Sequence, residues 1–342
     1  MSQQFTASVQ HQLPGRWLVD VSYTGNVGRH FTTGGWNLNQ LDNQFLGLGL
    51  DLQTQVPNPN RGLFPGALGG ATISREQSLL PFPYYQGVTV RGARMGNFNS
   101  HMFIVSLEKR MSKGLSVMFN FTGGKLISEG LNSPVDFGSI EQTNEWAYQD
   151  SKYNRRLERS VDPTDVSQRA VVSLLYELPF GKSGSGFVKR VIGGWQVNTI
   201  GVMQTGLPVL VRGASNFRAI RPNSTGVSAK LDSPTAQRWF NTDAFVNPAN
   251  FTFGNIGRVL PDVRGPGTVN WDLSLIKNTR LTERINLQFR AEAFNFMNSV
   301  NLGLPNGGFS AGPNGRNQSG TFGTITSARD ARNIQFGLKI LF

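Results

Sequence analysis

The last segment of the chain alternates strictly between apolar residues and polar or small ones. The apolar positions are Ile334, Phe336, Leu338, Ile340 and Phe342. Because successive side chains of a strand point to opposite faces, this spacing predicts a strand with one continuous apolar face that ends at a terminal aromatic residue. A soluble sheet can show the same alternation, so one segment does not separate a membrane barrel from a soluble protein.

The alternation returns along the whole chain in segments of roughly ten residues, the length of a tilted strand that crosses an outer membrane. These segments cover residues 5–13, 17–24, 103–107, 115–121, 172–178, 195–203, 269–275 and 285–293. With the final segment, residues 333–342, they predict an all-β antiparallel up-and-down meander of about nine long strands. The repetition favours a transmembrane β-barrel over a soluble sheet.

Short and long connections alternate between the predicted strands. The short ones are Pro14-Gly15, Ser112-Lys113-Gly114, residues 179–194 and Thr282-Glu283-Arg284. The long ones run from about 25 to 98, 124 to 165, 206 to 267 and 297 to 331. Compact soluble domains rarely contain so many long loops, whereas outer-membrane barrels combine short periplasmic turns with long extracellular loops. The alternation therefore predicts a periplasmic C-terminus.

An odd number of strands places the two chain ends on opposite sides of the membrane. A complete bacterial barrel has an even number of strands, which places both ends on one side. The first residues also lack the basic and apolar segments of an export signal. We therefore expect the C-terminal part of a larger barrel, and an open half-barrel in this chain, with strands 5–13 and 333–342 as its edges.

Composition narrows the classes of function. The chain has 342 residues, no Cys and a formal net charge of +12. The absence of Cys excludes a disulfide framework and thiolate chemistry, and no apolar run approaches the length of a membrane-spanning helix. Lys and Arg are scattered through turns and loops instead of forming one stripe. We therefore expect contact with outer-membrane lipid and no nucleic-acid partner.

Residues with catalytic or metal-binding chemistry are sparse. His11, His30 and His101 lie on separate segments without the spacing of metal ligands. The glycines of Gly47-Leu48-Gly49-Leu50 lack the third glycine and the strand-to-helix context of a phosphate loop. We predict no catalytic residue, no metal site and no cofactor, and an enzyme is the least supported class.

Two other groups of residues allow more than one interpretation. Acidic and basic residues gather in one predicted loop: Glu141, Glu145, Asp150, Glu158, Asp162 and Asp165, with Arg155, Arg156 and Arg159. Solvated ion pairs are the simpler interpretation, and a calcium or cationic-ligand site is the alternative. Trp17, Trp195 and Trp271 fall near predicted strand ends, where either an interfacial aromatic girdle or core packing would place them.

Short motifs in a fixed order resemble the TonB-dependent outer-membrane receptors, in particular the large Oar-like proteins that carry a carboxypeptidase-regulatory-like domain. The matching residues are Ser8-Val9-Gln10-His11-Gln12-Leu13-Pro14-Gly15, Leu107-Glu108-Lys109-Arg110, Ser112-Lys113-Gly114-Leu115, Tyr176-Glu177-Leu178-Pro179-Phe180-Gly181, Gly193-Gly194-Trp195-Gln196-Val197, Gln204-Thr205-Gly206-Leu207-Pro208, Trp239-Phe240-Asn241, Arg264-Gly265-Pro266-Gly267, Trp271-Asp272-Leu273-Ser274, Leu287-Gln288-Phe289-Arg290-Ala291-Glu292, Phe294-Asn295 and Thr326-Ser327-Ala328-Arg329-Asp330. Each motif alone is weak, but together they span nearly the whole chain.

The resemblance implies that residues 1–342 are a partial receptor barrel from a parent of about 22 strands. The parent would carry an N-terminal plug and a signal peptide and would be driven through TonB, which contacts only the part missing here. The resemblance also implies that Phe336, Leu338, Ile340 and Phe342 form the signal read by the barrel-assembly machinery. Without the plug, the chain is not expected to transport anything by itself.

The ligand is not specified by these motifs, and other functions fit the same strands. An outer-membrane barrel for adhesion or surface organisation would need no TonB-contacting segment. A secreted soluble β protein that binds glycan or nucleic acid would pack its apolar face into a sandwich core. Five residues of the third long loop are candidates for ligand contact by position alone: Arg212, Arg218, Arg221, Trp239 and Phe240. The expected location is the cell outer membrane.

Overall fold

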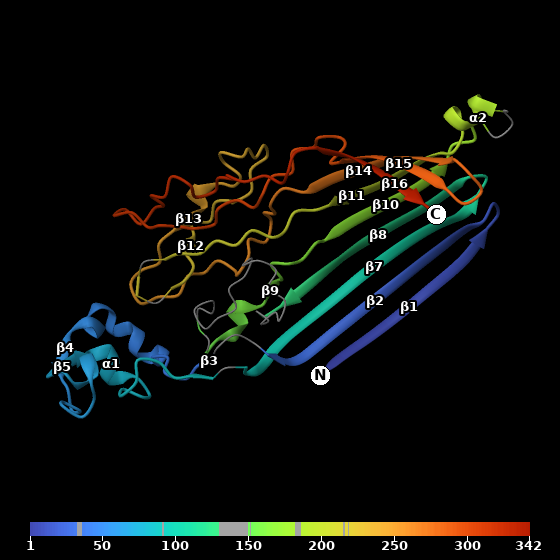
Figure 1. Cartoon of the computed structure of the whole chain (residues 1–342). Helices are drawn as coiled ribbons and strands as arrows, with labels where there is room; N and C mark the ends of the chain where they lie inside the picture. Colours follow the sequence, from blue (N-terminus) through green and yellow to red (C-terminus); the bar gives the residue numbers. More distant parts are fainter. Residues whose placement is uncertain are drawn as a thin grey trace.

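The structure is a computed structural model that describes residues 1–32, 36–90, 92–129, 150, 152–181, 186–214, 216–217 and 219–342, without the side chains of 187–189. Most of the chain forms one sheet of long strands (Figure 1). These are β1 (Ser2–Leu13), β2 (Trp17–Thr32), β7 (Arg94–Ser112), β8 (Leu115–Ser128), β10 (Gln168–Glu177), β11 (Trp195–Gln204), β14 (Thr268–Arg280), β15 (Asn286–Phe294) and β16 (Asn333–Leu341).

The long strands pair in chain order, each antiparallel to the next. A short strand, β9 (Ser160–Val161), extends the sheet beside the end of β8. The predicted meander of about nine strands is therefore confirmed. Within the described residues β1 and β16 pair with only one neighbour each, so the sheet is open at two edges, as expected.

Tight turns join the strands at one end of the sheet (Figure 1). In the β7–β8 turn, Lys113 and Gly114 have φ values of 53° and 82°. Two successive left-handed residues are typical of the hairpin turn that matches strand twist, and they explain why glycine follows Lys113. The β10–β11 connection is longer and contains helix α2 (Gly186–Ile192). The C-terminus lies at this short-turn end and the N-terminus at the opposite end, as the odd number of strands predicted.

Strands β2 and β7 extend further than predicted, to Thr32 and back to Arg94. Glycines interrupt the alternation in this region, and the sequence pattern places a loop there. In the fold, the ring of Phe5 covers Gly25, where an added Cβ would lie 2.1 Å from it. The aromatic ring fills the space of the missing side chain, so the ladder continues.

The long connections fold at the other end of the sheet. They contain β3 (Trp36–Asn37) paired with β6 (Thr89–Val90), η1 (Asn43–Gln53), β4 (Gln55–Pro57) paired with β5 (Thr72–Ser74), η2 (Gly66–Gly69), α1 (Arg75–Leu79), η4 (Arg155–Glu158), β12 (Asn223–Ser224) paired with β13 (Phe245–Val246), and η5 (Thr242–Ala244). We call these folded connections together the loop layer. None of the helices in the described ranges is long and apolar enough to cross a membrane.

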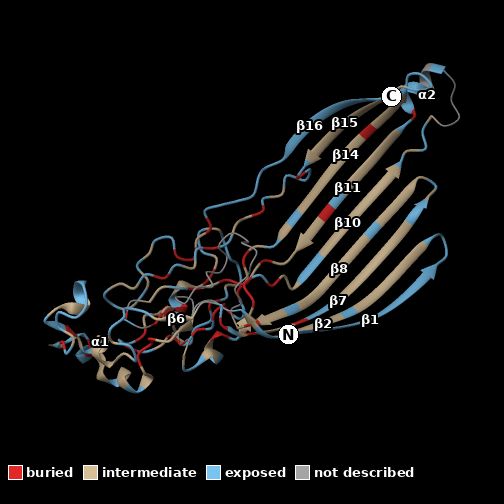
Figure 2. Ribbon diagram, turned by 60° about the horizontal axis from the view of Figure 1, so that its bottom comes forward, coloured by how far each residue is buried: buried red, intermediate tan, exposed pale blue. Residues whose placement is uncertain are grey.

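Buried side chains concentrate in the loop layer, whereas the sheet is mostly half-buried or exposed (Figure 2). Among the described hydrophobic residues of the long strands, only Ile276 is buried. The sheet therefore has no packed interior of its own, which is the condition of a sheet whose apolar face meets lipid.

Candidate functional site

The strand register places apolar residues of every long strand on the same face of the sheet. Val9 pairs with Val21, Val21 with Val105, and Val105 with Phe121, and the row continues through Ala170 and Met203 to Val269. Near the C-terminal edge, Leu273 pairs with Ala293 and Ala293 with Ile334. Because cross-strand partners point to the same side, this outer face is one apolar surface.

The opposite, inner face carries hydrogen-bonding side chains. The Ser106 hydroxyl donates to Asn120 at 2.7 Å. At the C-terminal edge, Gln335 Nε2 donates to Glu292 Oε2 at 2.6 Å, and Arg290 lies 3.8 Å from the same carboxylate. Such groups need water or polar partners, so this face is suited to line a hydrated lumen. The register predicted from alternation is thus the register that the sheet adopts.

Two Trp–Lys pairs mark the short-turn end of the outer face. Trp17 pairs across strands with Lys109, and Trp195 pairs in the same way with Lys277. The lysine Nζ lies over the tryptophan ring, 5.0 Å from its centroid in the first pair and 5.8 Å in the second. Each ammonium group then reaches backbone carbonyls of the adjacent connection, from Lys109 to Gly15 at 2.9 Å and from Lys277 to Arg190 at 2.7 Å. This arrangement is typical of a membrane interface.

The loop layer is held together by an aromatic core that joins the third and fourth long connections. The ring of Phe240 packs edge-on against Phe322 and Phe245, with ring centroids 5.0 and 5.8 Å apart. Phe309 packs in the same way against Phe322, with a centroid distance of 5.8 Å. All four rings are at least 95% buried. Aromatic contacts of this kind stabilise a packed core. The sequence pattern did not predict it, because these rings show no strand or helix period.

Arginines of the third connection bind the second one. Arg221 donates to both carboxylate oxygens of Glu158, at 2.7 and 3.2 Å, and both side chains are almost completely buried. Arg264 contacts Asp165 at 2.6 Å. Arg258 donates to the Ser128 hydroxyl at 2.6 Å. Such charge-assisted contacts with little water around them fix the position of one loop on the next.

The acidic residues of the second connection serve this structural role. Asp150 accepts hydrogen bonds from Gln40 and Asn43 of the first connection, and Asp162 accepts one from Ser128. The interpretation of solvated pairs is therefore wrong for these residues and for Glu158, because their side chains are buried away from water, and Asp150 and Glu158 bond to residues of other connections. Glu141 and Glu145 lie outside the described residues. Among the described residues, no group of three or more His, Asp or Glu side chains could hold a metal ion.

The candidates for ligand contact have varied positions. Phe240 and Arg221 are buried in the loop layer, so their side chains stabilise it instead of meeting a ligand at its surface. Trp239 is half-buried and donates from Nε1 to the carbonyl of Arg264 at 2.8 Å. Arg212 is exposed, and Arg218 lies outside the described residues.

The remaining residues singled out in the sequence have ordinary structural positions. His101 lies on the outer face with its Nδ1 2.7 Å from the Tyr23 hydroxyl. The Gly47–Leu50 segment lies inside the 3-10 helix η1 and forms no phosphate loop. Trp271 lies over Gly201 near the long-loop end of the outer face.

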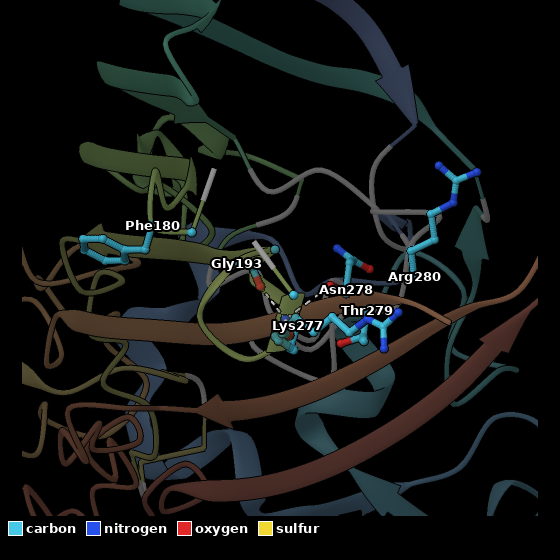
Figure 3. A pocket seen from close by; sticks show the side chains of 10 residues that line it. Phe180, Gly193, Lys277, Asn278, Thr279 and Arg280 are labelled. Atoms are coloured by element: carbon cyan, nitrogen blue, oxygen red, sulfur yellow. Dashed lines mark hydrogen bonds between the residues drawn. The ribbon is translucent and has the colours of Figure 1, made fainter. Parts of the chain in front are cut away.

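A hollow lies at the short-turn end of the sheet, between the β10–β11 connection and the end of β14 (Figure 3). Its volume is about 440 Å³, and its walls come from the β10–β11 connection and the end of β14. Figure 3 shows Lys277 directed toward Gly193, to whose carbonyl it donates a hydrogen bond. No catalytic set lines this hollow: its described side chains are basic, polar or aromatic.

Several solved structures align with the chain over part of their length. The outer membrane transporter YddB from Escherichia coli aligns with a TM-score of 0.45 and 9% identity over 99% of this chain and 32% of that one. The FrpB iron transporter from Neisseria meningitidis aligns with a TM-score of 0.40 and 9% identity, over 99% of this chain and 31% of that one. The siderophore receptor PiuA from Acinetobacter baumannii aligns with a TM-score of 0.41 and 7% identity, over 99% of this chain and 28% of that one. This chain thus spans about a third of their length.

No curated protein matches the sequence. The family model described as an outer membrane beta barrel domain matches residues 1–335, nearly the whole chain. The two-faced sheet, its open meander and this match agree, and the chain belongs to the outer membrane beta-barrel domain family, located in the cell outer membrane.

Proposed function

We propose that the chain is the C-terminal barrel part of a TonB-dependent outer-membrane transporter or receptor of the Oar-like group. The observation that carries the proposal is the partition of nine strands into an apolar outer and a polar inner face on a sheet that remains open. The ordered motifs of the sequence supply the link to this family. The ligand is left unassigned.

The open edges support a larger parent barrel. In hydrocarbon, the unpaired N–H and C=O groups along β1 and β16 would have no hydrogen-bond partner, which is costly for a membrane protein. Additional strands that pair with these edges remove that cost, and a wide barrel has the interior space for a plug. The chain by itself is then not competent for transport, and TonB is a partner of the complete protein.

The C-terminal strand is proposed as the segment that the barrel-assembly machinery recognises. Ile334, Phe336, Leu338 and Ile340 are between 57 and 72% exposed, and Phe342 is fully exposed. The ring of Phe336 stacks on Phe289 of the neighbouring strand, with centroids 6.2 Å apart. One backbone edge of β16 is unpaired in the described chain, so an assembly factor could bind it by strand addition.

The proposal is tested first on the gene and then on uptake. The nucleotide sequence upstream of Met1, read in the same frame, is expected to encode further alternating strands, a plug and a signal peptide. Cells that express the complete protein should accumulate a bound ligand only when TonB is present. A stop codon directly before Met1, or uptake that persists after deletion of TonB, would contradict the transporter assignment.

The assembly role has a separate test. F342S together with F336S should lower the amount of protein in the outer membrane several-fold, because the C-terminal segment loses two of the aromatic rings that the assembly machinery is proposed to recognise. The matched control is F217S, which changes an exposed phenylalanine of the loop layer and should leave that amount unchanged. Equal amounts for both variants would refute a special role of the C-terminal strand.

A further inference from the structure

The outer face ends in polar residues at the long-loop end of β7, opposite the Trp–Lys pairs. Lys109 pairs with Trp17 at the short-turn end, and His101 and Asn99 lie eight and ten residues before Lys109 on the same face. At about 3.3 Å per residue and a tilt of about 40°, ten residues rise roughly 25 Å along the membrane normal. The apolar band of an outer-membrane barrel has about this height. His101 and Asn99 therefore lie at the second membrane interface.

Two aromatic side chains hold His101 in place on the outer face. Its Nδ1 lies 2.7 Å from the Tyr23 hydroxyl, and the two rings stack with centroids 6.1 Å apart. The ring of Phe5 lies against both, at centroid distances of 6.1 and 6.3 Å. A polar pair of this kind is costly within hydrocarbon but suits the headgroup level, where tyrosine is enriched. Since Nδ1 is engaged, Nε2 is the ring nitrogen left for a further partner.

Two cationic side chains lie beside His101. Lys125 is its cross-strand partner on β8, and this exposed ammonium group has no hydrogen-bond or ion-pair partner among the residues that the structure describes. Arg29 donates from Nη1 to the Asn99 side chain at 2.9 Å, so its guanidinium group reaches the same face. The side-chain hydrogen bonds of Arg29 all use Nη1, which leaves Nη2 for another acceptor.

The acidic residue that follows β8 does not neutralise these cations. Glu129 accepts a hydrogen bond from Asn97 at 2.9 Å and lies 3.4 Å from Arg159 of the second connection. Its charge is therefore already matched by an arginine of the loop layer. Lys125 and Arg29 keep their positive charge at the edge of the apolar face, where it attracts anions.

We propose that Arg29, His101 and Lys125 bind the phosphate of an anionic lipid in the leaflet at the long-loop end of the sheet. The acyl chains then lie along Phe103, which is next to His101 on the outer face and 47% exposed. Charge complementarity selects an anion, and the position on the lipid-facing side excludes a soluble one. The long side chain of Lys125 can extend from the apolar band to the headgroups. This site is independent of the proposed transport function, since it requires only that the outer face meets lipid.

The level of the site can be measured by depth-dependent fluorescence quenching, which the natural absence of Cys makes direct. Ile127→Cys lies in the same cross-strand row as Asn99, and Val105→Cys lies nearer the middle of the outer face. Each variant of the full chain carries a fluorophore in nanodiscs. Lipids brominated near the headgroup should quench the first label most, and lipids brominated near the acyl-chain ends the second. The same depth for both labels would overturn the position of the site.

Headgroup binding is measured as retention of phosphatidylglycerol by the full chain in detergent, followed by native mass spectrometry. K125Q should weaken retention about fivefold, and K125Q with R29Q about 25-fold, because each basic residue near an anionic surface contributes about that factor. The matched control is R169Q. Arg169 is exposed and precedes the outer-face residue Ala170 along β10, so its side chain lies on the inner face and its loss should have no effect.

A conservative variant separates loss of binding from loss of folding. K125R keeps the positive charge and should retain phosphatidylglycerol as the original chain does, while circular dichroism compares the strand content of all variants. Three results would overturn the assignment to an anionic lipid on the outer face: equal retention of phosphatidylcholine, a loss in R169Q as large as in K125Q, or displacement of the lipid by millimolar inorganic phosphate.

Discussion

The sheet and the loop layer are ordered by different interactions. The sheet is held by continuous backbone hydrogen bonds between its strands, and most of its side chains are half-buried or exposed. Its apolar surface therefore needs lipid to cover it. The loop layer has few ladders, but it contains buried aromatic rings and a buried ion pair between Arg221 and Glu158. Substitutions should therefore disturb the two regions through different mechanisms, and the following variants separate them.

The largest effect is expected in the aromatic core of the loop layer. F240A removes a ring that is fully buried among Phe245 and Phe322. The cavity should cost about 4 kcal/mol of loop-layer stability. Limited proteolysis should cleave the third connection early while the strands stay protected. Simultaneous loss of both regions would show that they unfold as one unit.

The buried ion pair should come next. E158Q leaves the charge of Arg221 buried without its partner, which should destabilise the loop layer by about 3 kcal/mol. The surface pair of Arg238 with Asp243 is the control, with side chains 53 and 78% exposed, and D243N should change little. Urea denaturation in detergent measures both variants. If E158Q matched D243N, the buried pair would not hold the second connection in place.

A smaller change in folding free energy is expected from substitutions that compare the two faces of the sheet. V172R places a charge on the outer face near the middle of β10 and should cost about 2 kcal/mol in a bilayer. S173R changes the next residue, which points to the inner face, and should be tolerated. Folding titrations in lipid vesicles compare the two. Similar costs for both positions would contradict the assignment of lipid and lumen.

The smallest effect concerns the tight β7–β8 turn. G114A forces a Cβ onto a residue with a φ of 82°, at 2.8 Å from the Glu177 carbonyl, and should cost about 1 kcal/mol. G47A is the control, because a Cβ there meets nothing within 4 Å. Both are measured by thermal unfolding in detergent. A neutral G114A would mean that the hairpin relaxes around the new methyl group.

The sequence predicted the sheet well because each strand carries its own signal. Alternation sets which residues share a face, and a shift by one residue would reverse that face, so the register follows from the pattern. The ends of β2 and β7 were less predictable, since the glycines there are filled by rings from other strands. The sequence predicted the tryptophans near strand ends but not the lysines that pair with them, because each lysine lies far along the chain from its tryptophan.

The loop layer was not predictable in the same way. Glu158 and Arg221 are 63 residues apart, and no local period links them. Their acidic and basic neighbours looked like solvated charges, and only the folded connections show which of them lose contact with water. A buried pair depends on packing between distant segments, which residue spacing does not encode.

The amino-acid sequence by itself therefore determined the class of the protein, the order of its strands and the side of the sheet that each residue occupies. These properties follow from a local period of two, which any strand of the chain expresses without its neighbours. The tertiary structure alone decided which loop residues are buried, how α2 is held against the rim and where the hollow forms. Those properties arise only when segments far apart in the chain exclude water together.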